Sequence, residues 1–99
     1  MKAIKWYVDE IAEEIEGAKE YAERYLECRA KGGQYASMFK EMSQDELKHA
    51  DNLHTMAVNE IQQLNTVYTP PVEMQEAWDK SHKEYVEKVA WIRQMLAMG

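Results

Sequence analysis

The chain has 99 residues and a formal net charge of −6, with 45% hydrophobic and 30% charged residues. This balance is typical of amphipathic helices in one domain, residues 1–99, and the acidic charge without a basic stripe argues against nucleic-acid binding. No stretch approaches the roughly 18 apolar residues of a membrane span, and the single cysteine with no apolar leader predicts a reducing, cytoplasmic location.

Glycine and proline interrupt the chain at two places, Gly32-Gly33 and Thr69-Pro70-Pro71. Strong helix formers fill the stretches between these breaks. We therefore expect three helices, at about residues 5–30, 34–66 and 72–97, and an all-α fold. The short glycine turn makes the first two helices a long antiparallel hairpin. The third helix packs either on this hairpin or on that of a neighbouring chain, and the sequence leaves both arrangements open.

The helix at 5–30 carries one apolar stripe, with a carboxylate at its margin. At about 100° per residue, Glu14 lies close in angle to the stripe, whereas Glu13 and Glu16 point away from it. The stripe consists of Ile4, Tyr7, Val8, Ile11, Ile15, Ala18, Ala22, Tyr25 and Leu26.

The helix at 34–66 has two apolar faces. Its main stripe contains Tyr35, Met38, Phe39, Met42, Leu53, Met56 and Leu64. Glu46 and His49 fall in the centre of that stripe, and we expect them to be buried with it. Leu47, His54, Val58 and Ile61 form the second face, which we expect to pack on the third helix or on a neighbouring chain.

The helix at 72–97 offers no second set of metal ligands. Its stripe comprises Met74, Trp78, Tyr85, Val89, Ile92 and Leu96, and it also carries His82. Asp79 lies about 100° from the centre of the stripe, and the helix's glutamates also face away. We therefore interpret His82 as a core or interface histidine.

Glu46 and His49 are spaced so that both side chains can hold one metal ion. A carboxylate on an apolar face is normally paired or bound to a metal, and Glu14 on the adjacent helix is the third candidate. Two carboxylates and an imidazole suit Fe, Mn or Zn. The alternative is a buried pair between Glu46 and a basic residue or tyrosine, with His49 as a hydrogen-bonded core histidine.

Two segments carry a resemblance to a known family: Glu13-Glu14-Ile-Glu16-Gly-Ala-Lys-Glu-Tyr21 and Glu46-Leu-Lys-His49-Ala50. They resemble the ferritin-like superfamily, in particular rubrerythrin-type domains and the encapsulated ferritins, and also small phage-encoded ferritin-like proteins. The resemblance implies that Glu14, Glu46 and His49 are the metal ligands. It further implies that Tyr21 lies beside the site, and that Glu13 and Glu16 are outward acidic positions through which metal reaches it.

The same resemblance implies a non-haem di-iron protein with ferroxidase activity. Because such bundles use two glutamates and two Glu-x-x-His pairs, one chain supplies half of a site. We therefore expect half of a ferritin-like four-helix bundle, completed in a homodimer or a ring of dimers, with two irons per dimer at the interface.

Two other functions remain open from the sequence. One is a structural or interaction protein, a helical assembly module with a vestigial or non-redox metal site. The other is a zinc-dependent hydrolase, which is disfavoured because the chain has no His-Glu-x-x-His motif.

Overall fold

A computed structural model of the chain describes residues 2–98, and within that range it contains three α-helices and no strand. The helices are α1 (Lys2–Ala30), α2 (Ala36–Asn65) and α3 (Val72–Ala97). The all-α prediction is confirmed, and the helix bounds agree with those expected to within a few residues. Over the described residues, none of these helices has the length and hydropathy that crossing a bilayer requires.

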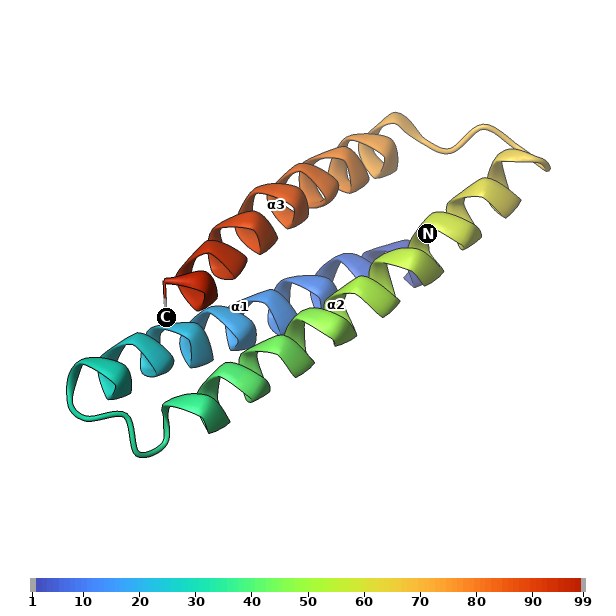
Figure 1. Ribbon diagram of the computed structural model, residues 1–99. Helices are drawn as coiled ribbons and strands as arrows, with labels where there is room; N and C mark the ends of the chain where they lie inside the picture. Colours follow the sequence, from blue (N-terminus) through green and yellow to red (C-terminus); the bar gives the residue numbers. More distant parts are fainter. Residues whose placement is uncertain (1, 99) are drawn as a thin grey trace.

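The three helices form an elongated bundle that measures 55 × 17 × 17 Å. α1 and α2 run antiparallel as a hairpin, and α3 returns along the bundle in the same direction as α1 (Figure 1). The closest backbone packing joins α1 to α2 and α1 to α3. α1 is therefore the central helix, and α2 and α3 each pack against it.

The hairpin turn depends on two glycines in the left-handed region of backbone space. Gly32 and Gly33 have φ angles of 110° and 78°, which cost other residues free energy because a Cβ atom would clash. The N–H of Gly33 donates to the carbonyl of Cys28 at 2.7 Å and satisfies one of the last carbonyls of α1. The chain thus reverses within a few residues and sets α2 beside α1.

Small side chains line the contact between α1 and α2. Ala18, Ala22, Ala50 and Ala57 are fully buried, and side chains of this size let two helix backbones approach closely. Ser43 is also fully buried, and its hydroxyl donates to the carbonyl oxygen of Ala18 at 2.7 Å. This buried hydrogen bond favours one register of the two helices, since any other register would leave the buried hydroxyl without a partner.

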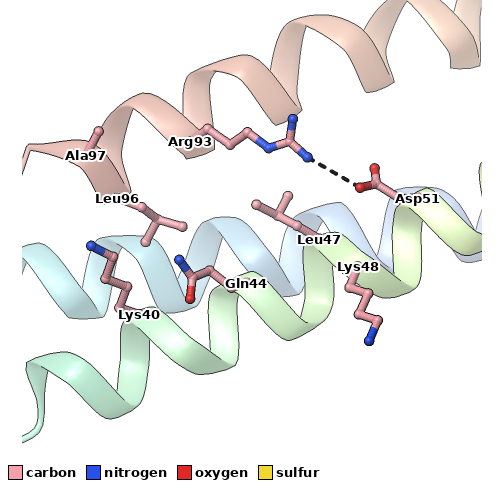
Figure 2. A pocket seen from close by; sticks show the side chains of 8 residues that line it. All are labelled: Lys40, Gln44, Leu47, Lys48, Asp51, Arg93, Leu96 and Ala97. Carbon is pink, nitrogen blue, oxygen red and sulfur yellow. Dashed lines mark hydrogen bonds and ion pairs between the residues drawn. The ribbon is translucent and has the colours of Figure 1, made fainter.

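α3 is attached to α2 by a row of polar and aromatic contacts. Asp51 accepts hydrogen bonds from the hydroxyl of Tyr85 and from Arg93, and Figure 2 shows the latter bond beside the groove between the two helices. Further along, Nε2 of His54 lies 2.8 Å from Nδ1 of His82. Of the second apolar face predicted for α2, His54 contacts Trp78 and Tyr85 of α3, and Leu47 lines a groove together with Leu96 of α3. Burial raises the pKa of Tyr85 to about 12.

The predicted main stripe of α2 is not the buried face. The residues of α2 that the chain buries are Ala36, Ser43, Leu47, Ala50, Ala57 and Ile61. Tyr35, Met38, Met42 and Met56 are exposed, and Phe39, Leu53 and Leu64 are only partly buried. The prediction was wrong because it weighted large apolar side chains as core, whereas the buried face combines small side chains, which allow close helix packing, with Leu47 and Ile61. The stripes predicted for α1 and α3 are buried or partly buried, except that His82 is exposed.

Candidate metal centre

Glu14, Glu46 and His49 meet at the middle of the hairpin. Nδ1 of His49 lies 3.3 Å from Oε2 of Glu14 and 3.9 Å from Oε1 of Glu46. One donor atom from each residue can be chosen so that all three lie within 4.8 Å of one another. Among residues 2–98 this is the one group of three or more histidine, cysteine, aspartate or glutamate side chains so arranged.

The register of the hairpin brings these residues together. Glu14 lies one turn before Ala18 on α1, and Glu46 lies one turn after Ser43 on α2. Ser43 bonds to Ala18, and the two helices are antiparallel. The residue one turn before Ala18, which is Glu14, therefore faces the residue one turn after Ser43, which is Glu46. His49 follows Glu46 by three residues, so both side chains emerge on the same side of α2.

The electrostatics of the site are those of two carboxyl groups competing for one proton. A hydrogen bond with Glu14 is the main cause that raises the pKa of Glu46 from 4.5 to about 7, followed by partial burial. The negative charge of Glu14 adds to the rise, and His49 opposes it. A cation placed between the carboxylates would relieve the repulsion that the proton relieves here. The donor set therefore fits a metal ion.

Gly17 leaves room for the Glu46 side chain. A Cβ atom added at Gly17 would lie 3.0 Å from Oε2 of Glu46, closer than almost all real contacts of this kind. Gly17 lies in the interior of α1, where glycine costs roughly 0.5–1 kcal/mol relative to alanine. The structure thus shows which group occupies the space beside this glycine, namely the carboxylate of Glu46.

The three side chains lie at the surface of the single chain. The exposed fractions of the Glu14, Glu46 and His49 side chains are 25%, 28% and 54%. The expectation that Glu46 and His49 are buried within the chain was therefore wrong, and the reason is the orientation of α2 described above. Exposed Met42 and Met56 belong to the same face of α2.

The accessory residues predicted from the sequence are not members of this cluster, and their roles beside the site stay predictions. Glu13 and Glu16 are exposed, as their helical phase predicts. The Tyr21 ring stacks on Phe39 of α2, with ring centroids 6.3 Å apart and planes inclined by 27°. Tyr21 therefore contributes an aromatic contact between α1 and α2.

Comparison with protein-family models supplies the family. The model of rubrerythrin matches residues 8–95, which is most of the chain. The chain belongs to the rubrerythrin family. A comparison with curated proteins and one with solved structures found no match. Rubrerythrin-family domains typically bind iron at carboxylate-rich sites, and the Glu14–Glu46–His49 cluster is of the residue types that such sites use.

The cluster has the residue types of half of a ferritin-like di-iron ligand set. Ferritin-like di-iron centres take two single glutamates and two Glu-x-x-His pairs. Here Glu14 provides the single glutamate, and Glu46 with His49 provides the pair. α3 adds no further carboxylate or imidazole to this cluster over the described residues.

Proposed function

We propose that two copies of the chain associate through the face of the α1–α2 hairpin that carries Glu14, Glu46 and His49, and that the pair binds two irons and oxidises Fe(II). The observation that supports this most is the position of an incomplete ligand set at an uncovered surface. A site exposed in this way is completed when the same patch of a second copy covers it.

The surroundings of the cluster favour a second copy as the covering partner. Met42 lies four residues before Glu46, and Leu53 lies four residues after His49. A twofold axis that crosses α2 between Glu46 and His49 would set Met42 against Leu53 of the partner subunit. Met42 is 40% exposed in the single chain, and flexible apolar side chains of this kind adapt well to an interface.

Within such a pair, each residue has a defined task. The carboxylates of Glu14 and Glu46 would neutralise and hold the ions, and His49 would provide a nitrogen ligand from each chain. Because the pKa of Glu46 is raised to about 7, metal binding near neutral pH would displace protons from the protonated fraction of this carboxyl group. The bound iron supplies the redox chemistry, the oxidation of Fe(II) to Fe(III) with O2 as the electron acceptor.

An anaerobic Fe(II) titration, followed by exposure to air, tests the proposal. Absorbance and oligomeric mass should be recorded together on the parent chain, on Glu46→Ala and on His49→Ala. Glu41→Ala, an exposed carboxylate on the same helix, is the matched control. We expect about one iron per chain and rapid oxidation in the parent and control, and loss of both in the two ligand variants.

Two results would count against the proposal. If Glu46→Ala and His49→Ala bind iron as well as the parent does, the cluster is not the iron-binding site. A parent chain that dimerises but oxidises Fe(II) no faster than buffer would instead support the alternative function, a helical assembly module without redox activity.

A further inference from the structure

A pair of histidines outside the proposed iron centre joins α2 to α3. Nε2 of His54 and Nδ1 of His82 are 2.8 Å apart. His54 is the inner member, because its ring stacks on Tyr85 at a centroid distance of 4.2 Å with planes inclined by 10°. The ring of Trp78 is also close, with its centroid 5.3 Å from that of His54. The two imidazoles thus come from separate helices and meet through their nitrogen atoms.

We propose that His54 and His82 together bind a divalent transition-metal ion, which clamps α3 onto α2. Two metal–nitrogen bonds of about 2.0 Å that meet at a right angle set their nitrogens about 2.8 Å apart. The observed separation has this value, and each ring would turn so that its lone pair points off the line between the two nitrogens and toward the shared ion. Right-angled nitrogen ligands are those of a tetragonal site, which suits Cu(II) and Ni(II).

The surroundings hold the pair in place without a metal. Asp51 lies one turn before His54 on α2 and accepts hydrogen bonds from Tyr85 and Arg93 of α3. Figure 2 shows the bond between Asp51 and Arg93. These bonds already fix the two helices at the level of the histidines. The two helices that carry the ligands are therefore already held together before metal binds, as in other preorganised sites.

His82, the outer member of the pair, makes the site accessible from solvent. His82 is exposed, so the ion can reach the pair from solvent and water can fill the remaining positions. The affinity of an imidazole site for divalent first-row metal ions generally increases from Mn(II) to a maximum at Cu(II). With two protein ligands, we infer a Cu(II)- or Ni(II)-class site, separate from the carboxylate-rich cluster that includes Glu14.

The distance also fits a hydrogen bond between the two rings, so the experiment must separate a shared proton from a metal. Cu(II) should be titrated into His49→Ala, which lacks the imidazole of the proposed iron centre and leaves His54 and His82 as the histidines of the chain. Electron paramagnetic resonance then reports how many imidazole nitrogens bind copper. We expect one Cu(II) per chain with two imidazole nitrogens.

The double variant His49→Ala/His82→Asn should bind Cu(II) at least tenfold more weakly and should lose the two-nitrogen signal. His49→Ala/Lys83→Asn, altered at the adjacent exposed position of α3, is the matched control and should behave like His49→Ala. In parallel, Cu(II) should raise the melting temperature of His49→Ala but not that of the His82→Asn double variant. Copper binding that is unchanged by His82→Asn, or a signal without two imidazole nitrogens, would overturn the proposal.

Discussion

The Glu46 carboxylate of α2 occupies the space that a side chain on Gly17 of α1 would need. The position of an added Cβ atom at Gly17 is 3.0 Å from Oε2 of Glu46. Glycine at this position lowers the helix propensity of α1, and it also leaves the space that the carboxylate of Glu46 on α2, a candidate metal ligand, occupies. A substitution at Gly17 should therefore change the free energy of unfolding and the affinity for metal in different directions.

Gly17→Ala should stabilise the metal-free chain while it weakens metal binding. Alanine raises helix propensity by up to ~1 kcal/mol, and the flexible end of Glu46 can shift by a few tenths of an ångström to admit the methyl group. The shifted carboxylate should lower iron affinity roughly tenfold, as displacement of supporting groups does at other metal sites. Chemical unfolding and Fe(II) titration of the same variant measure the two effects. Unchanged affinity would show that Glu46 can bind metal from the displaced position.

Glu46→Gln should change how the stability of the metal-free chain depends on pH. In the fold, the hydrogen bond with Glu14 raises the pKa of Glu46 from 4.5 to about 7. Because the folded pKa exceeds the unfolded one, the stabilising contribution is present below about pH 4.5 and is lost as pH rises through 7. The free energy of unfolding of the parent should therefore fall relative to that of Glu46→Gln between pH 5 and pH 8, by on the order of 1–3 kcal/mol.

Urea unfolding in the presence of a chelator, at pH 5 and pH 8, measures this difference. Glu41→Gln is the matched control, since Glu41 is exposed on the same helix. A parent and a Glu46→Gln variant whose stabilities run parallel over this range would mean that Glu14 and Glu46 do not share a proton.

Ser43→Ala should destabilise the hairpin by about 1 kcal/mol, the net value of one buried hydrogen bond. The hydroxyl is fully buried and donates to Ala18 at 2.7 Å, and alanine leaves a small space with no new clash. Ser37→Ala, at an exposed position near the start of α2, should change stability little. Thermal or urea unfolding checks both. An equal effect of the two substitutions would contradict the role of Ser43 in setting the register.

Met42→Glu should dissociate the proposed homodimer without unfolding the chain. Met42 is 40% exposed in the single chain, so the charge is tolerated there, whereas burial between subunits would cost about 3 kcal/mol. Val86→Glu on α3 is the control, because Val86 is 51% exposed and lies on a different helix from the cluster. Sedimentation at micromolar concentration distinguishes the two variants. A dimer that survives Met42→Glu would have a different interface.

Part of the site could be read from spacing alone. Glu46 and His49 are three residues apart, and a helix places such residues on one side whatever surrounds it. The turn at Gly32 and Gly33 made the first two helices antiparallel neighbours, which brought Glu14 within reach. The three helices and the apolar stripe of α1 follow from equally local causes, namely helix propensity, chain breaks and a period of 3.6 residues.

The sequence by itself thus determined the helices, their order and the pairing of Glu46 with His49, because these depend on neighbours along the chain. Tertiary structure decided which face of α2 is covered. Ala50 and Ala57 allow α1 to approach more closely than the methionines would, so the small residues turned inward and the methionine face stayed open. The space beside Gly17 and the contact of His54 with His82 likewise depend on how whole helices pack, and no spacing within one helix encodes them.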